Sequence, residues 1–285
     1  MASATDNHSA PAVEKEAGVG APTGADVNGA TATQRYDYGG NPLLHAHTGN
    51  EPRFAAFGGE FQPGLYRATT SRKLANPAPL GLSAFALTTF VLSLVNVGAR
   101  GISVPNVALA LAYGYGGLVQ LLAGMWEMAV GNTFGATALS SYGGFWISYA
   151  ILLTPAFHAL DKYGTAEEAS VLGFFLTGWF IFTFLLLMCT LRSTVMFFLL
   201  FFTLDLTFLM LACSEYAKAN GAAGSAVTLQ QAGGGFGLLA AFLAWYNAFA
   251  GMADSSNSFF LIPVFHFPWS EKAREDRAKT ARETV

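Results

Sequence analysis

Six long apolar stretches follow one another from residue 80 onward, and short polar or charged segments separate them. They cover residues 80–97, 107–128, 137–157, 171–190, 194–213 and 235–253. Each is about 20 residues long, which is the length that an α-helix needs to cross a hydrocarbon layer of about 30 Å. The pattern therefore predicts an all-α membrane protein with six transmembrane helices.

The composition supports this class. Hydrophobic residues make up 53% of the chain, charged residues make up 12%, and mean hydropathy is +0.40. This is too little charge for an ordinary soluble domain of this length. We therefore expect a lipid bilayer around the chain. The net charge of -3 and the absence of a basic block argue against a nucleic-acid partner.

Neither catalysis nor cofactor binding is indicated. Cys189 and Cys213 stand at the ends of apolar stretches, which favours buried free thiols over a disulfide or a metal site. No nucleophile stands with a base, and no metal ligands share a helical spacing. We therefore expect no enzyme, no cofactor and no metal.

Charge on the connecting segments predicts the orientation. An even number of crossings leaves both termini on one side. That side carries Arg67, Arg72, Lys73, Arg192, Lys272, Arg274, Arg277, Lys279 and Arg282, whereas the other side carries Arg100, Lys162 and Lys218. Positively charged loops are retained in the cytoplasm, so both termini are predicted to be cytoplasmic.

The flanking regions differ from the crossings. Residues 1–70 are mostly small and polar, which predicts a disordered cytoplasmic tail, with the aromatic residues of 54–66 either lying at the membrane surface or docking on the bundle. Residues 71–254 form the predicted transmembrane domain. In residues 255–285, Pro263 and Pro268 break an aromatic segment that is too short for a seventh crossing, and a charged tail follows. We expect an interfacial segment and then a cytoplasmic tail.

A proline-rich string precedes the first crossing: Asn76, Pro77, Ala78, Pro79, Leu80, Gly81 and Leu82. Each proline lacks an N–H and pushes the preceding residue out of the α region, so a helix is expected to start here, with Pro79 in its first position. The amides of Gly81, Leu82 and Ser83 would then be free donors at the positive end of a helix, which attracts anions.

Polar and aromatic stripes follow on two crossings. Helical spacing places Phe85, Thr88, Thr89, Leu92 and Asn96 on one face of the first. Its hydroxyl and amide groups either line a pathway or bond to helix carbonyls and neighbouring helices. The third crossing presents Tyr142, Phe145, Trp146 and Tyr149 on one face, a stripe that suits packing as well as a pore.

Three ordered motifs resemble those of a known family. They are the string 76–82 with its following aromatic, Thr-Thr pair and Asn; Gly131-Asn132-Thr133-Phe134-Gly135; and Ser141-Tyr142-Gly143 followed by Phe145-Trp146. The chain resembles the acetate uptake transporter family, whose bacterial members are the succinate–acetate permeases. The resemblance covers about residues 70–255, and the long hydrophilic start resembles that of fungal members.

The resemblance implies a function and a set of sites. It implies transport of acetate and similar short monocarboxylates across the plasma membrane, either coupled to protons or through a channel-like path, by a ring of subunits that is typically a hexamer. Each subunit would have its own pore, with residues 76–82 as the cytoplasmic vestibule and Phe85, Tyr142 and Leu204 as the constriction. Thr88, Thr89 and Asn96 would be polar residues that line the pore, and Ala244 would influence substrate preference.

Two carboxylates lie within or beside the crossings, where a charge is costly to bury. Glu127 resembles a Glu of the family and is expected either to accept bonds from the loops at Asn76 or Asn132 or to handle a proton. Asp205 follows Leu204 and is a candidate for pairing with a neighbouring subunit.

Two other functions remain open. One is export of ammonium or ammonia, a role proposed for fungal relatives, although the start of a helix near Gly81 favours anions over cations. The other is a nutrient-sensing membrane protein whose long tail carries the output.

Overall fold

The computed structural model describes residues 74–270 together with 273, 274, 277 and 279. The expectations for residues 1–70, including the surface segment 54–66, and for most of the charged tail lie outside this part of the chain.

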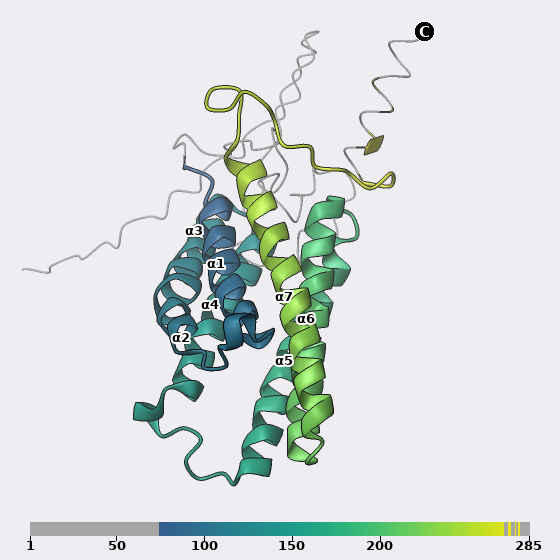
Figure 1. Cartoon of the computed structure of the whole chain (residues 1–285). Coiled ribbons are helices and arrows are strands. Elements are labelled where there is room, and N and C mark those ends of the chain that lie inside the picture. Colours follow the sequence, from purple (N-terminus) through teal and green to yellow (C-terminus); the bar gives the residue numbers. More distant parts are fainter. Residues whose placement is uncertain (1–73, 271–272, 275–276, 278, 280–285) are drawn as a thin grey trace, which may run out of the picture. The chain divides into compact units, whose positions relative to one another are not determined.

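Helices make up nearly all of the described chain (Figure 1). The elements are α1 (Ala78–Asn96), α2 (Asn106–Tyr113), a π-helical segment (Gly114–Val119), α3 (Gln120–Val130), α4 (Thr133–Leu153), α5 (Thr165–Thr190), α6 (Val195–Ala219) and α7 (Ala223–Met252), with short 3₁₀ turns at Ala99–Gly101 and Pro155–Phe157. Since α2, the π segment and α3 are continuous, the described chain forms six long helices, and the predicted fold class is confirmed.

Five of the six are long and apolar enough to cross a membrane, and α4 is the exception. With 21 residues it reaches about 32 Å at 1.5 Å per residue, which is sufficient in length. It is less apolar because threonines, serines and glycines recur along it. Neighbouring helices bury many of its side chains, among them Tyr142, Phe145 and Trp146, so α4 does not depend on lipid to cover its surface.

Two helices extend further than the apolar stretches predicted. Helix α5 begins at Thr165 instead of 171, and its first turn carries Glu167 and Glu168, which the positive end of the helix stabilises. Helix α7 begins at Ala223 instead of 235 and includes Gln230. The predicted starts were wrong because hydropathy marks the part of a helix inside the hydrocarbon layer, whereas backbone hydrogen bonding continues beyond it.

Packing is uneven around the bundle. Helix α1 packs closely against α7 on one side and against the π segment and α3 on the other, while α6 lies between α5 and α7. Helix α4 packs against α3, but it meets α5 and α6 through aromatic side chains. The ring centroids of Phe145 and Trp179 are 5.2 Å apart, and those of Phe134 and Phe201 are 5.4 Å apart. The space between α1, α4, α5 and α6 is therefore bridged by side chains.

The π segment allows α1 to approach closely. A Cβ atom added at Gly116 would lie 2.5 Å from the Thr88 hydroxyl oxygen, so a larger residue would push the helices apart. Because the segment adds a residue to one turn, it changes which side chains of α3 face the bundle interior.

An irregular segment after α7 lies across the end of α6 (yellow in Figure 1). The Val195 amide donates to the Phe265 carbonyl at 2.7 Å, the Trp269 indole donates to the Leu191 carbonyl at 2.7 Å, and the Tyr246 hydroxyl donates to the Pro263 carbonyl at 2.5 Å. Several of its apolar side chains are exposed, including Phe259, Phe260 and Leu261. Its position at the membrane interface stays a prediction.

Candidate transport pathway

Two cavities meet at a pair of buried apolar side chains. The larger measures about 380 Å³ and the smaller about 20 Å³, and both are lined by Phe85 and Leu204. Tyr142 lines the smaller cavity, with its ring centroid 6.0 Å from that of Phe85. All three side chains are buried, at 5%, 4% and 3% exposure for Phe85, Leu204 and Tyr142. The structure thus brings together the three residues predicted to form the constriction. We call them the ring.

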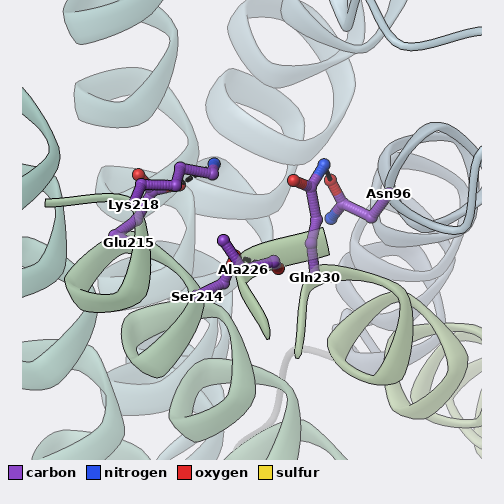
Figure 2. A network of polar contacts seen from close by, with 6 residues as sticks. All are labelled: Asn96, Ser214, Glu215, Lys218, Ala226 and Gln230. Carbon is purple, nitrogen blue, oxygen red and sulfur yellow. Dashed lines mark hydrogen bonds and ion pairs between the residues drawn. The ribbon is translucent and has the colours of Figure 1, made fainter. Parts of the chain in front are cut away.

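The larger cavity reaches the helix ends farthest from residues 76–82, and we call it the outer cavity. Polar groups from α1, α6 and α7 stand at this end (Figure 2). The Gln230 amide donates to Asn96 Oδ1 at 3.5 Å, and Lys218 Nζ lies 2.6 Å from Glu215 Oε1. A bond of 2.8 Å from the Ser214 hydroxyl to the Ala226 carbonyl joins α6 to α7 below them. The mouth therefore combines one cation with amides and carboxylates.

The smaller cavity lies on the other side of the ring, and we call it the inner cavity. Its lining includes Leu82, Phe134 and Phe197, which stand near the starts of α1, α4 and α6. Since those helix starts lie at the same end of the bundle as the proline-rich string, the inner cavity leads toward the predicted cytoplasmic side. At about 20 Å³ it has room for about one water molecule.

Tyr142 is held by contacts that the sequence did not reveal. Its hydroxyl shares a hydrogen bond of 2.9 Å with Thr183 on α5. Its ring stacks against Phe208 with an interplanar angle of 12° and lies edge-on to Phe182. These contacts come from helices distant in sequence, so a local motif could not indicate them. They hold both the aromatic side chain and the hydroxyl of Tyr142 in place.

The three polar residues predicted to line the pore, Thr88, Thr89 and Asn96, separate into two groups. Thr89 and Asn96 line the outer cavity. Thr88 lines neither cavity; it packs against Gly116 and donates its hydroxyl to the Ala84 carbonyl at 2.9 Å. For Thr88 the structure therefore shows the packing alternative.

The proline-rich string starts α1, as predicted, but caps it differently. The helix begins at Ala78, whose amide donates to Asn76 Oδ1 at 3.0 Å. The Gly81 amide donates to the Pro77 carbonyl at 3.2 Å, so the expectation that it is a free donor was wrong. The helix starts earlier than expected, and this supplies an acceptor for Gly81. Leu82 is the member of the string that lines the inner cavity.

Glu127 lies in a buried junction between α3 and α4. Asn132 donates to Glu127 Oε2 at 2.8 Å, and its own Oδ1 accepts the Gly135 amide at 3.0 Å, which caps α4. A Cβ atom at Gly135 would lie 2.4 Å from Asn132 Nδ2, so the junction requires glycine there. Glu127 is fully buried and lines neither cavity. The structure thus shows one of the two roles expected of Glu127, which is to accept a hydrogen bond from the Asn132 loop.

Ala244 and Asp205 also lie away from both cavities. Ala244 is fully buried on α7 and packs in the core with Ala240 and Ala248. Asp205 is 7% exposed, and its Oδ1 has no hydrogen-bond partner within residues 74–270. The pairing of Asp205 with a neighbouring subunit stays a prediction.

One residue of the inner cavity escaped the sequence analysis. Gln120, at the start of α3, is fully buried and lines this cavity beside Phe85 and Leu204. A polar side chain inside the apolar stretch 107–128 was the available signal, but a single amide among so many apolar residues did not distinguish a pathway from helix packing.

A bundle of six long helices, mostly apolar, with cavities on both sides of a buried ring defines a multi-pass membrane protein of the permease or channel type. The model of the GPR1/FUN34/yaaH family matches residues 57–269, and the chain belongs to this family. The family predicted from the three motifs is thereby confirmed, and membership in it agrees with the expectation that the chain is not an enzyme.

Named relatives agree with this class. "Acetate permease A" of Emericella nidulans is 63% identical over 257 residues, which cover 88% of this chain and 85% of the relative. "Ammonia transport outward protein 2" of Saccharomyces cerevisiae is 51% identical over 221 residues, covering 77% and 76%. A solved structure, that of the bacterial acetate channel SatP, matches with a TM-score of 0.59 and 35% identity, covering 67% of this chain and 99% of that one.

Proposed function

We propose that this protein moves acetate and similar short monocarboxylates across the plasma membrane, through the outer cavity, the ring and the inner cavity. The observation that carries the proposal is the shared lining: Phe85 and Leu204 belong to both cavities, so a molecule passing from one to the other would move past these two side chains. The similarity to an acetate permease and to an acetate channel supports acetate as the substrate.

The chemistry of the ring favours small solutes with a single charge. A carboxylate loses much of its hydration in an apolar neck, and each further charge increases that cost. Polar groups adjoin the neck on the outer side, where Thr89 and Asn96 line the cavity. A small monocarboxylate, or its protonated acid, can therefore cross partly dehydrated, while bulky or multiply charged acids would cross at a greater cost.

Reconstitution tests this function and its coupling. The purified full chain is placed in liposomes, and uptake of labelled acetate is measured with and without an inward proton gradient, for the wild type, Phe85→Ala and Tyr142→Ala. Uptake that follows the gradient and changes in the variants supports proton-linked transport through the ring. Uptake that ignores the gradient but changes in the variants supports an anion channel. Uptake no greater than in empty liposomes would contradict acetate transport.

Ammonia export is the second candidate, because one relative with 51% identity is named for it. The outer cavity contains Glu168 and Glu215, which would attract a cation, although Lys218 pairs with Glu215. The same liposomes, loaded with ammonium and a pH-sensitive dye, separate the two functions. Ammonium-driven pH changes without acetate uptake would favour export.

We also propose that the protein is a homo-oligomer, a hexamer by family resemblance. Large apolar side chains face outward on α5, among them Phe174, Ile181 and Leu185, and are available to lipid or to a neighbouring subunit. Native mass spectrometry in detergent gives the number of subunits, and a monomer under mild conditions would contradict the proposal.

A further inference from the structure

Asp205 is a carboxylate in the middle of a transmembrane helix. It stands on α6 and is 7% exposed, and its Oδ1 has no hydrogen-bond partner among residues 74–270. Neither of the ion pairs in this part of the chain includes it. An ionised carboxylate that is buried without a partner is costly, whereas a protonated carboxyl group costs much less. Packing alone would therefore favour an apolar residue at this position, and a function that needs a carboxyl group is the alternative.

The helix places Asp205 at the level of the ring. Phe201 and Phe208 lie one turn before it and one turn after it, on the same face of α6. Phe201 lines the inner cavity, and Phe208 lines the outer cavity. Both contact Tyr142, with their aromatic-ring centroids 6.4 Å and 6.5 Å from that of Tyr142. Asp205 therefore stands at the boundary between the two cavities, close enough to Tyr142 for its charge to act on the hydroxyl.

The hydroxyl groups of Tyr142 and Thr183 leave one hydrogen unused. Each hydroxyl carries one hydrogen, and the two groups share a single bond of 2.9 Å. Whichever of them donates, the hydrogen of the other has no acceptor among the described residues. Both side chains are buried. A donor without an acceptor thus lies near a carboxyl oxygen without a donor, and the two are not bonded to each other.

No acidic or basic side chain faces Asp205 from the helices packed against α6. Helices α4 and α7 contain none, and α5 has Glu167 and Glu168 in its first turn. Apart from Asp205 and Tyr142, the titratable side chains of α4 to α7 stand within two turns of a helix end, and they are Tyr149, Glu167, Glu168, Cys189, Cys213, Glu215, Tyr216, Lys218 and Tyr246. The titratable group beside Asp205 is therefore the Tyr142 hydroxyl.

We propose that Asp205 binds the proton that accompanies acetate and transmits its own protonation state to the ring through the Thr183–Tyr142 pair. The inference rests on the proposed transport function and adds a proton-binding residue to its proton-linked form. A proton that reaches Asp205 from water in the outer cavity neutralises the carboxylate. When the carboxyl O–H bond breaks, the proton passes to water on the inner side, and the carboxylate accepts the unused hydroxyl hydrogen. That bond acts on Tyr142, so the ring responds to the protonation of Asp205.

Asp205→Asn tests the proposal, because the amide has nearly the same shape and does not take up the proton. Labelled acetate uptake into liposomes is measured with and without an inward proton gradient. The gradient should stimulate uptake by the wild type, and Asp205→Asn should lose this stimulation. Exchange of labelled for unlabelled acetate needs no net proton movement and should persist. Glu127→Gln is the matched control, since Glu127 is also a buried carboxylate but is bonded to Asn132, and it should keep the stimulation.

A double variant, Tyr142→Phe with Thr183→Val, tests the link to the ring. It removes both hydroxyls and keeps side chains of similar shape, a change that can be nearly neutral for stability. Without the hydroxyls, the protonation state of Asp205 no longer reaches the ring. The double variant should therefore lose the stimulation by the proton gradient, and this result decides the question even if Asp205→Asn does not fold.

Full stimulation in Asp205→Asn or in the double variant would overturn the inference. Loss of acetate exchange together with the stimulation would also overturn it, because Asp205 would then have a structural role. Break-up of the oligomer in Asp205→Asn, seen by native mass spectrometry, would overturn it in favour of pairing with a neighbouring subunit. Gradient-independent uptake by the wild type would overturn it while leaving acetate transport in place. Absence of uptake by the wild type would instead contradict the proposed function itself.

Discussion

The outer and inner cavities share two lining residues, Phe85 and Leu204, but differ in size and in the polarity of their other lining residues. The outer cavity measures about 380 Å³ and carries Lys218, Gln230 and two glutamates, whereas the inner one measures about 20 Å³ and has an apolar lining surface. The space is therefore wide on one side of the ring and narrow on the other. Under the proposed function, solute would enter through the wider cavity, which has polar groups at its mouth, and would be selected at the apolar ring.

The largest effect is expected where the two cavities share a wall. Leu204→Ala removes part of that wall, so butyrate uptake relative to acetate uptake should increase about tenfold in liposomes, the scale of discrimination that one or two methylene groups provide. Leu239→Ala is the control, because Leu239 is exposed on the same bundle and lines neither cavity. An unchanged ratio in a well-expressed Leu204→Ala protein would show that Leu204 does not narrow the path.

A smaller effect is expected from removing the hydrogen bond that holds Tyr142 of the ring in place. Thr183→Val removes the hydrogen-bond partner of the Tyr142 hydroxyl, which should lower stability by about 1 kcal/mol and reduce the selectivity for acetate over butyrate. Thr177→Val removes a similar bond of 2.8 Å from the same helix α5 to Tyr216 on α6, away from the ring. It should cost similar stability and leave selectivity unchanged. Equal selectivity in the two variants would contradict a special role for the Tyr142 contact.

At the outer mouth the effect should be modest. Lys218→Gln removes the cation beside the outer cavity, so the KM for acetate should rise about two- to threefold at low salt, and the difference should shrink as salt screens the charge. Lys162→Gln serves as the control, because Lys162 is exposed on the α4–α5 connection and does not line the cavity. A salt-independent change in KM would indicate that the substitution acts through packing.

The smallest effect on transport is expected from Glu127→Gln. The amide oxygen of Gln can still accept the bond from Asn132, so uptake and its pH dependence should stay within about twofold of the wild type. Glu127→Ala removes the acceptor and should destabilise the protein by about 1–3 kcal/mol in chemical denaturation. A folded Glu127→Gln protein with a flattened pH profile would instead identify Glu127 as a proton carrier.

The sequence predicted those features that depend on neighbouring residues. Two prolines fix where α1 starts, and Asn132 caps α4 because its side chain reaches the amide of Gly135 three residues later. The family motifs placed Phe85, Tyr142 and Leu204 together, and the structure brings these three side chains to one place. Such inferences need only local geometry or a recognised motif.

Features that depend on distant contacts could not be predicted in this way. Thr88 and Thr89 are adjacent and chemically alike, yet Gly116 of the π segment occupies the space beside Thr88, while Thr89 faces the outer cavity. Likewise, the partner of Tyr142 is Thr183, 41 positions later. The π segment Gly114–Val119 is also not marked by the hydropathy pattern.

The central claim is that the ring separates two compartments, and cysteine accessibility tests it most directly. With Cys189 and Cys213 replaced by Ser, Asn96→Cys and Leu82→Cys are each exposed to a membrane-impermeant thiol reagent from outside the cell. Asn96→Cys should react rapidly and Leu82→Cys should not, and adding Leu204→Ala should make Leu82→Cys reactive. Equally fast reaction of Leu82→Cys and Asn96→Cys behind an intact ring would contradict the claim.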